Sequence, residues 1–79
     1  MRIKVLYFAS LRDNSKKAEE VIETSAKTID ELYSELNSKY HFTLDQSQLR
    51  AALNEDYAPF TTELNYNDTV VFIPPVAGG

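Results

Sequence analysis

The chain has 79 residues, a formal net charge of −4, one histidine and no cysteine. A chain of this length buries one modest core, so we expect a single domain without a deep pocket. The absence of cysteine excludes disulfides, thiol nucleophiles and Cys-based metal sites, and His41 alone is too few for a His-rich zinc site. The acidic charge disfavours nucleic acid as a partner, and we predict neither a metal site nor an autonomous enzyme.

The beginning of the chain predicts two paired strands. Residues 3–9 are rich in β-branched and aromatic side chains and are apolar on both faces, with Ile3, Val5 and Tyr7 on one and Leu6 and Phe8 on the other. This pattern indicates a central strand, or one whose second face meets a partner. Residues 11–17 are polar and predict a turn, and residues 18–24 predict a weaker strand that forms a hairpin with the first.

A cluster of glutamates lies on this second predicted strand. Because no proton-accepting partner converges on them, we interpret them as a solvated strand edge rather than a catalytic pair: Glu19, Glu20 and Glu23.

The clearest helix signal begins at Thr28. The segment Thr28-Ile29-Asp30-Glu31 matches a capping box, in which Thr28 accepts from the Glu31 amide and Glu31 reaches back to the Thr28 N–H. An apolar stripe at helical spacing then predicts a helix over about residues 29–40 that covers one face of a sheet: Ile29, Leu32, Leu36 and Tyr40. His41 predicts the C-terminal cap.

The remaining elements predict a mixed sheet. Residues 41–48 form a connector that sends Phe42 and Leu44 into the core, residues 49–53 a strand, residues 54–56 a turn, and Tyr57–Ala58 a short return strand. Residues 69–73 form a last strand with no polar face. If the first and last strands are parallel neighbours, their connection contains the helix, which is the β-grasp arrangement. We therefore expect an α+β, β-grasp domain of four to five strands over residues 1–73.

Both glycines of the chain lie at its very end, although average usage predicts about five or six. Without Cβ atoms, Gly78 and Gly79 can thread a narrow channel in a partner and present the terminal carboxylate. Pro74-Pro75 holds the base of the segment extended. An ionised carboxylate is a poor electrophile, so useful chemistry requires external activation, most simply by ATP to an acyl-adenylate. A featureless chain end is the alternative, but it leaves the preceding prolines and valine unexplained.

An apolar patch is the second candidate site. Leu6 and Phe8 share a face with Val71 and Ile73 if the alternating residues of both strands face the helix. A patch at the root of the tail indicates a protein interface. The alternative is that residues 41–48 cover it. Arg12, in the loop after the first strand, is either a contact for an anion or partner beside this patch or simply solvated.

Three segments resemble the small-subunit family of molybdopterin synthase: Val5-Leu6-Tyr7-Phe8-Ala9-Ser10-Leu11-Arg12-Asp13, Ala52-Leu53-Asn54-Glu55 and Phe72-Ile73-Pro74-Pro75-Val76-Ala77-Gly78-Gly79. The resemblance implies a ubiquitin-like sulfur carrier for molybdenum cofactor biosynthesis, with Arg12 and Ile73 at family positions linked to partner contacts. One departure is Asn67-Asp68, where the family turn usually reads Gly-Asp; asparagine tolerates the left-handed region, so the turn can survive.

The chemistry that the resemblance implies is carried by partners. An ATP-dependent activating enzyme adenylates Gly79, and a sulfur donor converts the adenylate to a thiocarboxylate. The tail, Pro74, Pro75, Val76, Ala77, Gly78 and Gly79, inserts into the catalytic large subunit, which uses the sulfur to build the dithiolene of molybdopterin from cyclic pyranopterin monophosphate. The complex is a heterotetramer with a carrier at each end of a large-subunit dimer. The isolated chain is itself non-catalytic and is expected to bind no cofactor.

Three other readings stay open at this point. A thiamine-pathway sulfur carrier shares the fold and the ending, but Pro-Pro-Val-Ala before Gly-Gly favours the molybdopterin type. A ubiquitin-like modifier would be joined through Gly79 to lysines of targets, and a plain interaction module would use the apolar patch alone. The apolar run after Met1 is too short for a signal peptide and ends at Arg12, and no stretch approaches the roughly 20 residues of a bilayer span. We expect no membrane partner and a cytoplasmic location.

Overall fold

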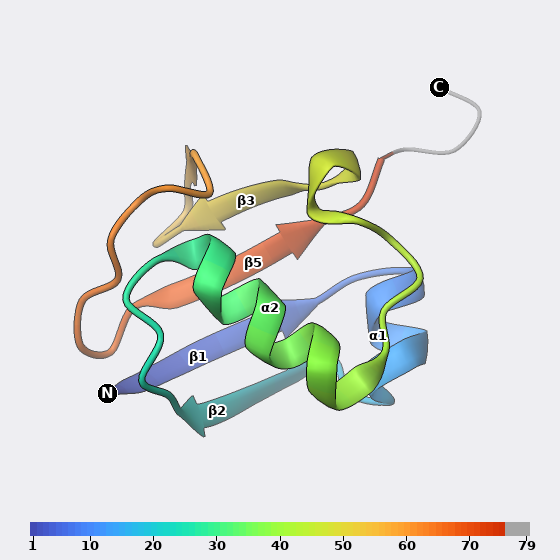
Figure 1. The fold of residues 1–79 in the computed structure, drawn as a ribbon, viewed down its shortest axis with the longest axis horizontal. Coiled ribbons are helices and arrows are strands. Elements are labelled where there is room, and N and C mark those ends of the chain that lie inside the picture. Colours follow the sequence, from blue (N-terminus) through green and yellow to red (C-terminus); the bar gives the residue numbers. More distant parts are fainter. Residues whose placement is uncertain (76–79) are drawn as a thin grey trace.

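A computed structural model describes residues 1–75 of the chain. One five-stranded sheet has the order β2-β1-β5-β3-β4, and α2 crosses one of its faces (Figure 1). The elements are β1 (Arg2–Tyr7), α1 (Ser10–Ser15), β2 (Glu19–Glu23), α2 (Ile29–Tyr40), a 3-10 helix (Gln46–Gln48), β3 (Arg50–Leu53), β4 (Asp56–Ala58) and β5 (Thr69–Ile73). β1 and β5 are parallel neighbours, the other pairs are antiparallel, and α2 lies in the connection between β1 and β5. The predicted β-grasp fold is confirmed. No helix within residues 1–75 is both long and apolar enough to cross a bilayer.

The strand register assigns every sheet residue to one of two faces. On the face toward α2, the alternating residues of β1 and β5 are completely buried: Ile3, Val5, Tyr7, Val70 and Phe72. They pack with the buried residues of α2, which are Ile29, Leu32, Tyr33 and Leu36. This confirms the predicted stripe, except that Tyr33 joins it and Tyr40 is only partly buried. We call the opposite side of the sheet the open face.

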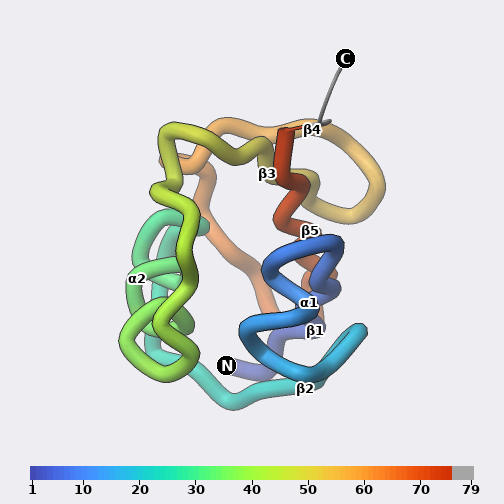
Figure 2. The backbone as a smooth tube through the Cα atoms, turned by 90° about the vertical axis from the view of Figure 1, so that its right-hand side faces the viewer, coloured from blue at the N-terminus to red at the C-terminus, as the bar shows by residue number. Residues whose placement is uncertain are grey.

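The connector from residue 41 to residue 48 lies on the α2 side of the sheet (Figure 2). As predicted, its apolar residues close the core: Phe42 is buried, and Leu44 packs against the same cluster. The Phe42 ring stacks on Tyr33 with centroids 5.4 Å apart and also contacts the ring of Tyr7. The connector therefore extends the helix layer and does not pack on Leu6 and Val71, on the other side of the sheet.

Residues 10–15 form a short helix, α1, and the predicted turn over residues 11–17 is wrong in this respect. Leu11 is completely buried and anchors the helix against the end of β1. Ala9 has φ 51°, which ends β1 at Tyr7 and turns the chain into α1. A six-residue helix is not stable by propensity alone, so its formation depends on this tertiary contact.

The ends of α2 follow the predicted capping, with one correction. The Thr28 side chain accepts from the Glu31 N–H, but the Glu31 carboxylate accepts from the N–H of Lys27, at 3.0 Å, rather than from that of Thr28. His41 has φ 55°, and its N–H donates to Asn37 O at 2.8 Å, as expected of a C-cap. The helix therefore spans the predicted residues 29–40.

The turn before β5 accommodates the asparagine that replaces the family's glycine. Asn67 has φ 67°, in the left-handed region that asparagine tolerates. The neighbouring Asp68 carboxylate is buried and accepts from Asn65 N at 2.7 Å and from Asn54 Nδ2 at 2.8 Å. Asn54 also exchanges two hydrogen bonds with the Thr69 backbone, each 2.9 Å long. These bonds fasten the β3–β4 turn to the start of β5.

Candidate functional site at the root of the tail

The tail begins where β5 ends, in the middle of the sheet. Ile73 is the last residue of β5, and Pro74 and Pro75 follow it outside any strand (Figure 1). Proline has no N–H to donate to a neighbouring strand, so pairing stops here. The remaining predicted tail residues lie outside the described part of the chain: Val76, Ala77, Gly78 and Gly79.

The apolar residues predicted beside this root lie together on the open face. One row of paired residues crosses all five strands: Glu19, Leu6, Val71, Ala52 and Tyr57. Leu6 and Val71 are half-buried neighbours in this row, and Ile73 lies one pleat closer to the tail. Phe8, just beyond the end of β1, keeps 43% of its surface exposed. The structure thus brings Leu6, Val71 and Ile73 to one face next to the tail.

The alternative, that residues 41–48 cover this patch, is wrong for Leu6 and Val71, because no residue of the connector lines the hollow beside them. Only the end of the connector, Ser47 and Gln48, borders the hollow beside Ile73. The connector is committed to the α2 side by the burial of Phe42 among Tyr7, Tyr33 and Tyr40. The side view shows α2 and the connector together on one side of the sheet (Figure 2). A shallow hollow lined by Leu6, Val71, Thr69 and the β3–β4 turn lies on the uncovered side.

Arg12 lies on α1 rather than in a loop, and its side chain is exposed. The helix follows β1 at the end of the sheet from which the tail departs (Figure 1). No ion pair joins Arg12 to a carboxylate within residues 1–75. Its role as a partner contact stays a prediction.

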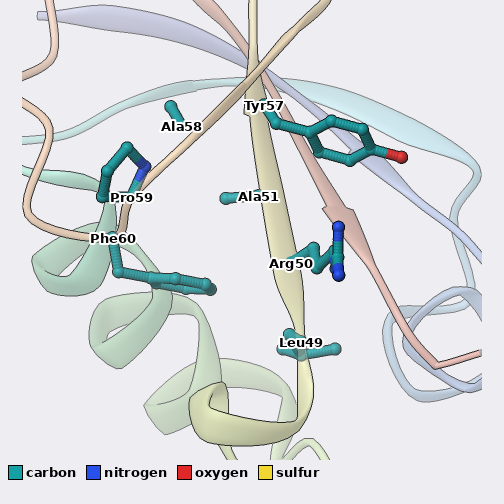
Figure 3. A pocket seen from close by; sticks show the side chains of 7 residues that line it. All are labelled: Leu49, Arg50, Ala51, Tyr57, Ala58, Pro59 and Phe60. Atoms are coloured by element: carbon teal, nitrogen blue, oxygen red, sulfur yellow. The ribbon is translucent and has the colours of Figure 1, made fainter.

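Two residues of this region were not predicted from the sequence: Arg50 and Tyr57. Tyr57 ends the row described above and is 69% exposed. The Arg50 guanidinium carbon lies 5.6 Å from the centre of the Tyr57 ring. Figure 3 shows both side chains on one side of β3, whereas Ala51, Pro59 and Phe60 lie toward α2. The sequence did carry a signal for this pair. Alternate residues of a strand lie on one face, so Arg50 shares its face with Ala52, and Tyr57, which pairs with Ala52, lies on that face too.

Glu20 is not the solvated residue that the sequence predicted. Its side chain is only 11% exposed and accepts hydrogen bonds from the Tyr7 and Tyr40 hydroxyls, both at 2.6 Å, and from Lys17 Nζ at 3.1 Å. Burial raises the pKa of the Glu20 carboxyl, but these three hydrogen bonds outweigh it and hold that pKa below its usual range. Burial, reinforced by Glu20, raises the pKa of the Tyr7 hydroxyl. The cluster joins β1, β2 and α2.

The other two glutamates of β2 are exposed as expected. Glu19 pairs with Lys4 at 3.3 Å, and Glu23 pairs with Arg2 at 3.5 Å. Neither contributes to a catalytic pair with Glu20, which is engaged with the two tyrosines on the other face. Within residues 1–75, no three histidine, aspartate or glutamate side chains are grouped so that they could hold a metal ion.

Comparisons with known proteins match the chain over nearly its whole length. The family model described as the ThiS family matches residues 5–79. The molybdopterin synthase sulfur carrier subunit of Mycobacterium tuberculosis is 35% identical over 82 aligned positions, which cover 100% of this chain and 99% of that protein.

Solved structures of similar proteins share the fold. The putative molybdopterin converting factor, subunit 1, of Pyrococcus furiosus is 28% identical with a TM-score of 0.80, over 96% of this chain and 99% of that one. A chain of the complex of subunits 1 and 2 of the molybdopterin-converting factor from Helicobacter pylori is 26% identical with a TM-score of 0.70, over 100% of both chains.

Proposed function

The chain belongs to the ThiS family, and from this premise we propose that it is a sulfur carrier of molybdenum cofactor biosynthesis. The observation that carries the proposal is the apolar patch of Leu6, Val71 and Ile73 on the open face, beside the root of a tail that begins with two prolines. A carrier needs both parts, because the partner must hold the folded body while the chain end reaches the reacting centre. The curated relative named above, aligned end to end, bears this function in its name.

The chemistry that we propose for Gly79 has two balanced steps. The terminal carboxylate oxygen attacks the α-phosphorus of ATP in an activating enzyme, and pyrophosphate leaves. Hydrosulfide supplied by the sulfur donor then attacks the acyl carbon, the bond from that carbon to the phosphate oxygen breaks, AMP leaves, and loss of the proton from sulfur leaves the chain ending in a thiocarboxylate. ATP is bound and used by the partner, and the chain holds no cofactor of its own.

The chain's own contribution is access and position rather than catalysis. Two terminal glycines have no Cβ atoms, so the chain end passes through a narrow channel and its carbonyl carbon stays open to attack. Pro74 and Pro75 limit the conformations of the tail base and so reduce the entropy lost on docking. An ionised carboxylate is a poor electrophile, so we assign its activation to the enzyme partner.

The proposed acceptor is the catalytic large subunit of molybdopterin synthase. It would cover the open face around Leu6, Val71 and Ile73 and take in the tail from Pro74 to Gly79. The Helicobacter pylori relative, which was solved together with subunit 2 of its converting factor, supports a partner of this kind. Burial of an apolar patch of this sort is what stabilises such complexes.

The experiment is a reconstitution with purified activating enzyme, ATP and sulfur donor, read by intact mass. We expect one oxygen of the chain to be replaced by sulfur, and the product to yield molybdopterin when the large subunit and cyclic pyranopterin monophosphate are added. Deletion of Gly78 and Gly79 abolishes the mass change and leaves the unfolding free energy unchanged. Fusing one residue after Gly79 has the same effect.

Two results would overturn the proposal. Isopeptide-linked conjugates between Gly79 and lysines, without any thiocarboxylate, would make the chain a protein modifier. A thiocarboxylate that forms but transfers no sulfur in the presence of the large subunit would assign it to another pathway, such as that of thiamine.

A further inference from the structure

The basic side chains of the open face differ in how they are paired. Arg2 and Lys4, on β1, form ion pairs with Glu23 and Glu19 of the adjacent strand. Arg50, on β3, forms no ion pair with any carboxylate within residues 1–75. Arg50 is also opposite Ile73, the last residue of β5 before the tail. An arginine without an internal counter-charge therefore lies beside the root of the tail.

Tyr57 holds this arginine in place. The guanidinium lies over the face of the Tyr57 ring, at 5.6 Å from its centre, and the ring itself is largely exposed. This cation–π contact engages the face of the ring and leaves the N–H groups of the guanidinium available to a hydrogen-bond acceptor. The pair is therefore arranged in advance for a planar, two-oxygen acceptor such as a carboxylate.

The pair is continuous with the path of the tail. A hollow of about 390 Å³ is lined by Arg50 and Tyr57 together with Ile73, Pro74 and Pro75, and the chain from Ser47 to Leu49 completes its wall. Any protein that receives the tail down to its root therefore covers this hollow and removes water from Arg50. Desolvating a guanidinium without a counter-charge costs free energy, so a partner that fits must supply an anionic group there.

We propose that Arg50, stacked on Tyr57, is a specificity contact that receives an aspartate or glutamate of the large subunit beside the entrance for the tail. The inference rests on the proposed function, because it identifies the chemistry of the surface that the carrier docks against. It concerns docking alone and gives Arg50 no part in the reaction at Gly79. The contact selects for partners with a matching carboxylate and against those with a basic residue at that point.

The test is the dissociation constant of the full chain with the large subunit, measured by calorimetry. Removing one member of a docked charge pair weakens binding strongly, so we expect Arg50→Glu to raise the dissociation constant by about 30-fold or more. Arg50→Lys keeps the charge but loses the planar fork, and we expect an intermediate loss of about 10-fold. Tyr57→Ala weakens binding, whereas Tyr57→Phe, which keeps the ring face, does not.

Arg2→Glu is the matched control, because Arg2 is an exposed arginine on the same face at the far end of β1 from the tail, already paired with Glu23. The dissociation constant of the Arg2→Glu chain with the large subunit should equal that of the unsubstituted chain. Increasing salt should weaken binding of the unsubstituted chain more steeply than binding of Arg50→Gln. Denaturant unfolding of each variant checks that the substitutions leave the fold intact.

Binding of a folded Arg50→Glu chain as tight as that of the unsubstituted chain would overturn this inference and leave the proposed function standing. Failure of the proposed function has a different signature, since the unsubstituted chain would then acquire no thiocarboxylate, or would acquire one and transfer no sulfur in the presence of the large subunit. The first outcome is measured on the Arg50→Glu chain by calorimetry, and the second on the unsubstituted chain by the reconstitution described above.

Discussion

Single residues in the left-handed region mark the places where this chain changes direction without glycine. Within residues 1–75, six non-glycine residues have positive φ: Ala9, Lys16, His41, Asn54, Glu55 and Asn67. Each such residue costs roughly 1 kcal/mol relative to a residue in an ordinary conformation. The chain accepts this cost at every tight turn described here, while both of its glycines lie at positions 78 and 79. This distribution agrees with a function for the terminal glycines other than turn formation.

The Glu20 carboxylate stabilises the folded chain by accepting hydrogen bonds from Tyr7, Tyr40 and Lys17. Because its pKa is lower in the folded chain than in the unfolded chain, the ionised carboxylate stabilises the fold at neutral pH, and this contribution is lost as the pH falls through the lowered pKa of the folded chain. We expect Glu20→Gln to lower the unfolding free energy by about 2 kcal/mol at neutral pH. The difference from the unsubstituted chain should shrink in acid, as measured by urea unfolding across the pH range.

Glu19→Gln is the control for this prediction, since Glu19 is exposed and pairs only with Lys4. Exposed ion pairs contribute at most about 1 kcal/mol, so the control should change stability little. A Glu20→Gln chain as stable as this control at neutral pH would contradict the assigned role of the tyrosine–glutamate cluster.

At the scale of elements, α1 is a short helix whose stability depends on one buried residue, Leu11. Its six residues are mostly polar, and only Leu11 and Ser15 are buried. Truncation of a buried leucine leaves a cavity, so we expect Leu11→Ala to lower the unfolding free energy by about 3 kcal/mol. Denaturant unfolding measures this loss.

Arg12→Ala on the same helix provides the comparison for Leu11→Ala. Arg12 is exposed, and exposed substitutions usually change stability by less than about 0.5 kcal/mol. Equal losses for the two variants would show that helix propensity, and not the buried leucine, holds α1 in place.

At the scale of the whole molecule, we propose that the two faces of the sheet have different roles: the face under α2 stabilises the fold, and the open face binds the partner. The neighbouring valines of β5 test this division, because Val70 is completely buried under α2 and Val71 lies half-buried on the open face. We expect Val70→Ala to lower the unfolding free energy by about 2 kcal/mol and Val71→Ala to change it far less. Binding to the large subunit should show the reverse order, with the greater loss for Val71→Ala.

Both measurements use one substitution type at adjacent positions, so side-chain size cannot explain a difference between the variants. If Val71→Ala destabilised the fold as much as Val70→Ala, the open face would be part of the core. If it left binding unchanged, the partner would dock elsewhere.

The sequence by itself determined the features that depend on neighbouring residues. The cap at Thr28, the apolar stripe of α2, the all-apolar strand β5 and the proline–glycine tail were all visible as local patterns, because hydrogen bonds at a helix end and side-chain periodicity act over a few residues. Even the β-grasp topology followed, since a single amphipathic helix between two strongly apolar strands leaves few alternatives.

Only the tertiary structure decided the burial of Glu20, the docking of α1, the exposure of the open face and the meeting of Arg50 with Tyr57. Each of these depends on strand register or on contacts between elements distant in sequence, such as Tyr40 with Glu20 or Arg50 with Ile73. A shift of one residue in register turns every side chain of a strand to the opposite face, and no local pattern excludes that shift. The surface that we propose for the partner therefore exists only in the assembled sheet.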